Sequence, residues 1–405
     1  YSAIRPLGAD IKGFGGTSSG PAPLLELHDN LKELFSPKIG EAITSVDIVD
    51  TENLIGRCVV SGNVRRSAAL AMGSHHDRRY LEMKNDQEKL YHHRWGSNNS
   101  FNAQVGMDYS WHAEQSQKNG EPGYIWLENA RTRGRFKDGP RYDDINVAGF
   151  NPCVEQQLED AELCCLVETY PAKHDDLEDY LRTLKIAYLY GKTITLSNTH
   201  WPETNAKMLK NRRIGLSQSG VVQAFNKHGR REMYNWCDKS YEHVKILDEE
   251  YSNWLCIPKA VRMTAIKPSG TVSLLNGSTP GIHYPEDEYY IRRIRFSKTS
   301  NLLDKLSAAG YYIEDDETAA QYQYYWADNS VSITVTFNAD EARQIQSALE
   351  LYETRLKAVS FLKHSETGYK QAPYEPISKK QYEKMSSQIV PIERIEDEAG
   401  GSGTK

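Results

Sequence analysis

Apolar residues recur along this chain in two patterns, and their alternation predicts an α/β fold. Spacings of three and four, which place side chains on one helix face, predict helices over 22–36, 41–57, 174–192, 300–309 and 340–360, a helix-and-loop stretch over 219–255 and a charged helix over 286–296. Short β-branched or alternating runs predict strands at 58–60, 193–196, 311–315 and 330–337. No repeat of fixed period interrupts this order, and the length slightly favours a barrel over an open sheet.

Composition describes an ordinary globular protein. The 405 residues are 39% hydrophobic and 26% charged, with a formal net charge of −6. No run approaches the ~18 apolar residues of a membrane span, and an acidic chain is a poor match for nucleic acid, which attracts a basic face. Six cysteines are too few for a disulfide scaffold and show no zinc-binding spacing. We therefore expect a cytoplasmic protein without a membrane, nucleic-acid or metal partner.

The two ends of the sequence predict an internal piece of a longer protein. The chain begins at Tyr1 rather than at a methionine. It stops in the glycine- and serine-rich stretch 399–405, which is typical of a flexible linker. We therefore expect some partner residues to lie outside it.

The segment 151–156, with the sequence Asn-Pro-Cys-Val-Glu-Gln, is the first candidate for chemistry. If it is extended, Asn151, Cys153 and Glu155 point the same way, because side chains two apart share a face. A carboxamide, a thiol and a carboxylate on one face could form an active site. The plainer interpretation is a buried cysteine at a strand end with polar neighbours.

Three loops are candidates for anion binding, and each has a plainer interpretation. Residues 268–271 (Pro-Ser-Gly-Thr) suit a helix start whose free N–H groups face an anion, or a simple capped helix. The glycine-rich loop 13–21 suits phosphates or is a plain loop. The turn 61–67 carries two arginines and suits an anion or solvent. Residues 75–95 are charged, and their four histidines lack ligand spacing, so we expect a solvated helix.

Four motifs in this order resemble the catalytic subunit of ribonucleotide reductases. They are the 61–67 turn, the 151–155 segment, the Leu-Cys-x-Leu stretch 163–166 and the 268–271 loop. The 12–21 start and the 368–377 tail look most like the monomeric, adenosylcobalamin-dependent (class II) branch. The resemblance runs from about residue 5 to residue 380.

The resemblance implies a ten-stranded α/β barrel with a central finger loop over residues 1–380, partial at its N-terminus, and a polar tail or linker over 381–405. Cys153 would become a thiyl radical that abstracts the 3′ hydrogen of a ribonucleotide, with Glu155 as general base. Asn151 would orient the ribose hydroxyls, and Cys164 would be one of two reducing thiols. Cys165 would point away from Cys164 on a strand and is left out.

The resemblance also implies binding residues and partners. The substrate phosphates would lie on Ser269, Gly270, Thr271 and Val272. Effector and specificity contacts would come from Lys12, Ser61, Gly62, Asn63 and Arg65. The implied cofactor is adenosylcobalamin, and the implied partners are a ribonucleotide substrate, a nucleotide or deoxynucleotide effector and a thioredoxin-like or glutaredoxin-like reductant of a monomeric enzyme. The monomeric branch suggests triphosphate substrates.

Some departures and alternatives remain open. The family's second reducing cysteine and its C-terminal thiol pair are expected outside this sequence, so the piece alone should turn over poorly. Within the family, a class I large subunit would need no cofactor of its own, because a dimetal ferritin-like partner supplies its radical. None of the 25 tyrosines shows the class I context, which favours class II. From another class, the chain could be a non-catalytic nucleotide-binding subunit, although Cys153 and Glu155 together argue against it.

Overall fold

The computed structural model describes residues 1–11, 17–61, 67–285, 288–292, 302–312, 334–337, 340–363 and 374–390. The α-helices in these ranges are α1 (Ala22–Phe35), α2 (Ser45–Val60), α3 (Arg78–Glu82), α4 (Gln87–His92), α5 (Ser110–Asn119), α6 (Leu127–Thr132), α7 (Leu177–Ile194), α8 (Pro202–Asn211), α9 (Val221–His228), α10 (Arg230–Leu255), α11 (Leu302–Ala308), α12 (Ile345–Tyr352) and α13 (Lys379–Ser386). The strands are β1 (Ala69–Ser74), β2 (Ser97–Asn102), β3 (Gly123–Ile125), β4 (Gly149–Phe150), β5 (Gln157–Leu158), β6 (Leu166–Thr169), β7 (Gly215–Gln218), β8 (Tyr290–Arg292), β9 (Thr334–Phe337), β10 (Ala358–Lys363) and β11 (Tyr374–Pro376).

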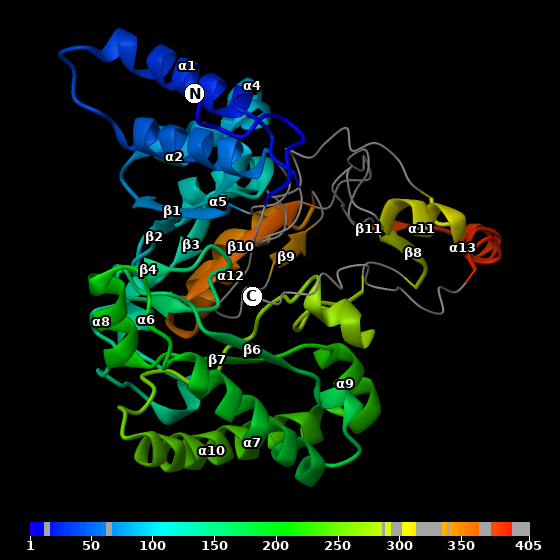
Figure 1. The fold of residues 1–405 in the computed structure, drawn as a ribbon. Coiled ribbons are helices and arrows are strands. Elements are labelled where there is room, and N and C mark those ends of the chain that lie inside the picture. Colours follow the sequence, from blue (N-terminus) through cyan, green and yellow to red (C-terminus); the bar gives the residue numbers. More distant parts are fainter. Residues whose placement is uncertain are drawn as a thin grey trace, which may run out of the picture.

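The larger sheet has five strands in the order β1-β2-β3-β10-β9. Its first three strands run parallel, β10 is antiparallel to β3, and β9 is parallel to β10. Helices α1 and α2 lie above it in the blue part of Figure 1, and α5 and α12 pack near β10. Because β10 follows β3 by more than 200 residues, this sheet joins distant parts of the chain.

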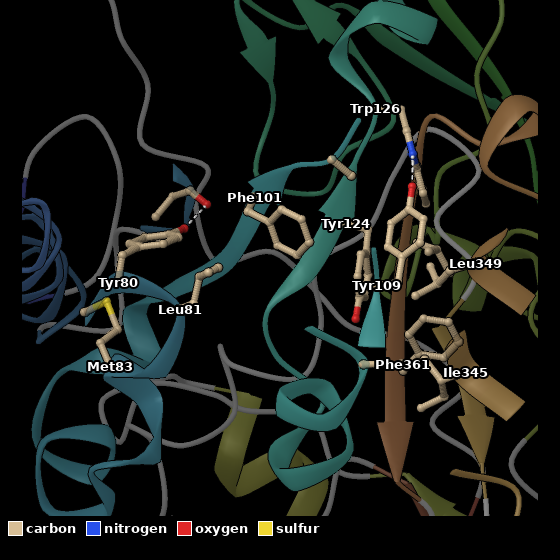
Figure 2. Packing of buried hydrophobic residues seen from close by; sticks show 14 of the residues in the cluster. Tyr80, Leu81, Met83, Phe101, Tyr109, Tyr124, Trp126, Ile345, Leu349 and Phe361 are labelled. Atoms are coloured by element: carbon tan, nitrogen blue, oxygen red, sulfur yellow. Dashed lines mark hydrogen bonds between the residues drawn. The ribbon is translucent and has the colours of Figure 1, made fainter. Parts of the chain in front are cut away.

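An aromatic core fills this part of the molecule (Figure 2). Phe101 and Tyr124 meet edge to face with ring centroids 5.0 Å apart. The buried indole N–H of Trp126 donates to the hydroxyl of Tyr109 at 3.0 Å, so the polar edge of this core is satisfied rather than stranded.

A second core lies between the parallel pair β6–β7 and the helices α7 and α10, which run side by side below it in Figure 1. The side chain of Asp176 caps α7 by accepting a hydrogen bond from the Asp179 N–H at 2.9 Å. The buried ammonium of Lys192 lies 2.6 Å from Asp248 on α10, so an ion pair also joins the two helices.

The antiparallel hairpin β4–β5 connects the two cores. On one side Phe150 and Val154 pack with Ile125 and Ala358 of the larger sheet. On the other side the amide of Gln156 donates to the Cys165 carbonyl, just before β6, at 2.9 Å. Residues 151–156 form the tip of this hairpin, so both halves of the molecule hold the candidate site in place.

The predicted α/β class is confirmed, and the described strands form mixed sheets of five and two strands. The helices predicted at 22–36, 41–57, 174–192 and 300–309 are all present, and 219–255 forms α9 and α10. The described part of the 330–337 strand is β9. None of the helices within the described ranges combines the length and the apolar character that crossing a membrane requires.

Two short strand predictions are wrong because a helix continues through them. Residues 58–60 are the last turn of α2, and α7 extends to Ile194 with Thr195 as its C-cap. Extending a formed helix through a β-branched residue costs only a few tenths of a kcal/mol, whereas starting a new strand needs a partner. Tyr311 and Tyr312 of the predicted 311–315 strand are also not in a strand, and 313–315 lie outside the described residues.

Two helix predictions fail in part, because distant strands determine the structure of some of their residues; 286–287 and 293–296 lie outside the described residues. Within 286–296, residues 290–292 form β8, which pairs with β11 more than 80 residues later. The 340–360 helix ends at Tyr352, and Ala358–Lys363 forms β10 between β3 and β9. A central strand with apolar residues on both faces lacks alternation, so periodicity does not identify it.

The prediction of a solvated helix at 75–95 is also wrong. The segment folds into α3, α4 and short 3₁₀ turns, and Lys84 and Arg94 are buried. Arg94 makes a two-pronged contact with the carboxylate of Asp50 at 2.6 and 2.7 Å, and Lys84 pairs with Glu121 at 2.7 Å. The charges in this segment therefore stabilise the interior instead of facing water.

Candidate active site

The hairpin tip is a tight turn and not the extended segment that was predicted. The Asn151 N–H donates to the Gln156 carbonyl at 3.0 Å, and the Val154 N–H donates to the Asn151 carbonyl at 2.8 Å. The Asn151 side-chain oxygen accepts from the Gln156 N–H at 3.0 Å. These bonds fold the tip onto itself, because Pro152 cannot continue a ladder and the chain must reverse within six residues.

The turn nevertheless brings the predicted residues together. The amide of Asn151 donates to Glu155 Oε2 at 2.7 Å. The Glu155 side chain is fully buried, and Cys153 between them is partly exposed. A carboxamide, a carboxylate and a thiol therefore share one end of the hairpin, reached by a turn rather than by the alternation of a strand.

Val154 is strained at this tip. Its φ of 62° lies in the left-handed region, which a β-branched residue rarely adopts. Its side chain is 8% exposed and packs with Ile125 and Ala358. Packing in the core thus holds the backbone in a conformation that places Cys153 and Glu155 on either side of the strained residue.

Lys267 is a site residue that the sequence analysis missed. Its ammonium donates to Glu155 Oε1 at 3.0 Å and lies 4.0 Å from Cys153 Sγ. Burial opposes its charge, but the negative charges of Glu155 and Cys153 outweigh this and raise the pKa of Lys267. The only signal in the sequence was its place directly before the 268–271 motif.

Cys164 and Cys165 differ as predicted for neighbours on opposite faces. Cys165 is buried, and its thiol donates to the Gly191 carbonyl on α7 at 3.4 Å, away from the tip. Cys164 has solvent-exposed surface, and burial around its sulfur followed by the charge of Glu155 raises its thiol pKa. Cys164 therefore remains a protonated thiol at neutral pH, electrostatically coupled to Cys153 and Glu155.

The 268–271 loop lies directly after Lys267 and leads into a 3₁₀ turn, Val272–Asn276. The Ser269 N–H donates to the Lys267 carbonyl at 2.9 Å, and the Gly270 N–H donates to the Pro268 carbonyl at 2.6 Å. Thr271 and Val272 are exposed. The predicted phosphate loop is thus an exposed turn next to the hairpin tip, and its first two N–H groups already bond within the loop.

Glu168 on β6 contacts this loop through Ser269, and it is a second residue that the sequence analysis missed. Its carboxylate accepts hydrogen bonds from Ser217 at 3.1 Å, from Ser219 at 2.7 Å and from the buried Ser269. Burial raises the Glu168 pKa although the three hydroxyls lower it. The hydroxyl of Ser269 is therefore engaged inward, and the outer face of the loop is formed by Thr271 and Val272.

The proposed effector residues lie mostly outside the described residues. This applies to Lys12, Gly62, Asn63 and Arg65. Ser61 is described, and its hydroxyl donates to the Cys58 carbonyl at 2.8 Å and lies 3.3 Å from the Ser19 hydroxyl. This contact places the flanks of the 13–21 and 61–67 loops side by side. Within the described ranges, no three His, Cys, Asp or Glu side chains form a group that could hold a metal ion.

Known proteins resemble this chain in both sequence and fold. Residues 1–35 match the family model described as "B12-dependent ribonucleotide reductase, insertion domain". The chain is 46% identical to the probable adenosylcobalamin-dependent ribonucleoside-triphosphate reductase of Dictyostelium discoideum, over 97% of this chain and 57% of that protein. It is 44% identical to the adenosylcobalamin-dependent ribonucleoside-triphosphate reductase of Euglena gracilis, over 96% and 58%.

A solved structure shows the same similarity. A B12-dependent (class II) ribonucleotide reductase matches with a TM-score of 0.82 and 34% identity, covering 97% of this chain and 63% of that chain. The chain spans about three fifths of the length of the curated relatives it matches. Over that span the chain is similar in sequence and fold to adenosylcobalamin-dependent ribonucleoside-triphosphate reductases, and the resemblance found in its motifs is confirmed.

Proposed function

We propose that this chain carries the reaction centre of a class II ribonucleotide reductase, which reduces ribonucleoside triphosphates to 2′-deoxyribonucleotides. The observation that carries the proposal is the hairpin tip, where Asn151 and Lys267 hold the Glu155 carboxylate beside Cys153. In this proposal residues 1–380 belong to a ten-stranded barrel, the β4–β5 hairpin is its finger loop, and 381–405 form a tail.

The proposed cofactor is adenosylcobalamin, as in the names of the relatives. When bound, it supplies the radical that removes a hydrogen atom from a thiol. Among the described residues, Cys153 fits the reactive end of this cofactor, because its thiol is partly exposed on a hairpin tip that both cores hold rigidly.

The residues of the site account for the remaining steps. The Cys153 thiyl radical takes the hydrogen atom from C3′, forming S–H, and Glu155 accepts the proton of the 3′-hydroxyl. The 2′-hydroxyl accepts a proton from Cys164 and leaves as water. Cys164 and a second thiol close to a disulfide and so supply two electrons and two protons, one proton to the leaving hydroxyl and one to C2′. Glu155 returns its proton to the 3′ oxygen, and Cys153 returns the hydrogen atom to C3′.

Binding residues and partners complete the proposal. The substrate triphosphate would lie on the exposed side of the loop formed by Ser269, Gly270, Thr271 and Val272. A nucleotide effector would contact the loops that contain Lys12, Ser61, Gly62, Asn63 and Arg65. We propose a cytoplasmic monomer that is re-reduced by a thioredoxin-like or glutaredoxin-like protein.

The test is CTP reduction by the complete gene product with a dithiol, with and without adenosylcobalamin. We expect deoxyCTP only when adenosylcobalamin is present. Activity that requires a ferritin-like subunit instead would support the class I alternative. CTP binding without reduction under either condition would support a non-catalytic nucleotide-binding subunit and contradict the proposal.

The adjacent cysteines provide a matched pair for the reducing thiol. Cys164→Ser should lower multiple-turnover CTP reduction about a hundredfold or more, because the leaving hydroxyl loses its proton and electron donor. Cys165→Ser should retain most activity, since that thiol bonds to α7. Equal losses in the two variants would show that the assignment of Cys164 is wrong.

A further inference from the structure

Lys267 is fixed at both its backbone and its side chain. Its N–H donates to the Ser217 hydroxyl at 2.8 Å, and its carbonyl accepts from the Ser269 N–H at 2.9 Å. From this position the side chain reaches the hairpin tip, where it contacts Glu155 and lies near Cys153. One residue thus connects β7, the 268–271 loop and the hairpin tip.

The Glu155 carboxylate depends on this cation. Its side chain is 0% exposed, whereas that of Lys267 is 30% exposed. Burying a charged group is costly unless it is paired and hydrogen-bonded. Asn151 donates to one oxygen and Lys267 to the other. Because each carboxylate oxygen can accept two hydrogen bonds, both oxygens can still receive a substrate hydroxyl.

The charges around Lys267 all have the same sign when ionised. Glu155 and Cys153 face it from the hairpin tip, Cys164 from the segment before β6, and Glu168 from β6. Glu168 already accepts hydrogen bonds from three serine hydroxyls. The ammonium therefore acts mainly on Glu155 and on the nearby thiols.

We propose that Lys267 is a positioning residue of the reaction, which holds and orients the Glu155 carboxylate and is electrostatically coupled to the Cys153 sulfur. This inference rests on the proposed function for its catalytic role. Lys267 directly precedes the 268–271 loop. Movement of that loop on phosphate binding would therefore change the contacts of Lys267 with Glu155 and Cys153.

The first measurement uses no cofactor. In the complete gene product, alkylation of Cys153 by iodoacetamide is followed across pH by quantifying the peptide that contains it, since only the thiolate reacts. Lys267→Met should move the midpoint of this profile upward by about one pH unit, so that alkylation near neutral pH slows about tenfold. Lys267→Arg retains the charge and should leave the midpoint close to that of the unsubstituted protein.

The second measurement is the pH dependence of kcat/KM for CTP reduction with adenosylcobalamin. Lys267→Met should move the acidic limb of this profile, because it removes the positive charge that contacts the proposed general base. Lys267→Arg should restore most of the shift. The matched control is Lys259→Met, because Lys259 pairs with Glu249 on the exposed surface and both side chains are 61% exposed.

The outcomes separate the two proposals. A uniform loss of activity at every pH with an unchanged alkylation midpoint would overturn the role of Lys267 and indicate a structural ion pair. Equal midpoint shifts in Lys267→Met and Lys267→Arg would also overturn it, because charge would not be the cause. If the unsubstituted protein reduces no ribonucleotide, the proposed function fails, and the alkylation profiles alone decide the coupling of Lys267 to Cys153.

Discussion

The two ends of the β4–β5 hairpin hold their charges in opposite ways. Near its base, Arg213 is enclosed with Asp144 and Glu162, and all three side chains are at most 1% exposed. Arg213 donates to Asp144 at 2.7 and 2.8 Å and to Glu162 at 3.0 and 3.1 Å. At the tip, the buried Glu155 is paired with a cation that remains 30% exposed.

The difference separates a closed ion cluster from a more open one. At the base two carboxylates hold the guanidinium through four hydrogen bonds, and breaking them would leave buried charges unpaired. At the tip the single ammonium leaves acceptor sites open on Glu155 and a thiol beside it. The closed cluster fixes the hairpin, and the open one is available for chemistry.

The largest expected effect comes from opening the closed cluster. Arg213→Met removes the cation that Asp144 and Glu162 share and leaves Asp144 only the longer contact with Arg262 at 3.4 Å, so it should lower the free energy of unfolding by about 3–5 kcal/mol. Urea unfolding of the complete gene product measures this, with the exposed Lys259→Met as the control. A loss below about 1 kcal/mol would contradict the distinction between the two ends of the hairpin.

Glu159 is paired with cations that are more exposed still, because Lys207 and Lys210 are 33% and 58% exposed, compared with 30% for Lys267. Burial opposes its ionisation, but hydrogen bonds from Lys207, Lys210 and Asn211 outweigh burial and lower its pKa from 4.5 to about 2. A lowered carboxyl pKa contributes stability above pH 4.5, and this contribution is lost as the pH falls towards about 2.

Glu159→Gln should therefore cost about 2 kcal/mol at pH 7, and this cost should shrink as the pH falls from 4.5 towards about 2. Urea unfolding at pH 7, 4 and 3 checks the trend. A cost that is independent of pH would show that the charge of Glu159 is not what stabilises the protein.

The smallest expected change in stability is at Val154 in the strained tip, where the prediction concerns which of two variants is more stable. At an ordinary position glycine is less stable than alanine by roughly 0.5–1 kcal/mol. At the positive φ of Val154 the order should reverse, because alanine retains a strain of about 1 kcal/mol that glycine lacks. Both variants lose the packing of Val154 against Ile125 and Ala358. Thermal unfolding of Val154→Gly and Val154→Ala compares them, and a more stable alanine variant would contradict strain at this position.

The sequence was informative where local rules determine the structure. The helix that became α7 carries its own cap at Asp176, and the helices at 22–36 and 300–309 follow from apolar spacing. β8 and β10 were not predicted, because each depends on a strand far along the chain. The burial of Arg94 was also hidden, since its partner Asp50 lies 44 residues away.

The site shows the same limit. Asn151, Cys153 and Glu155 were identified from a short motif, but the turn that gathers them depends on Val154 packing against the larger sheet. Lys267 could not be assigned from sequence, because it reaches Glu155 across 112 positions and looks like any lysine before a loop. Local chemistry could be predicted, whereas the charge that organises it comes from tertiary contacts.

The most direct test of the account compares two cysteine variants of the complete gene product, with adenosylcobalamin, a dithiol and CTP. Cys153→Ser removes the thiol at the hairpin tip, and Cys256→Ser removes an exposed thiol after the end of α10. The account predicts deoxyCTP formation at background for Cys153→Ser and near the unsubstituted rate for Cys256→Ser. Sustained reduction by Cys153→Ser would contradict it.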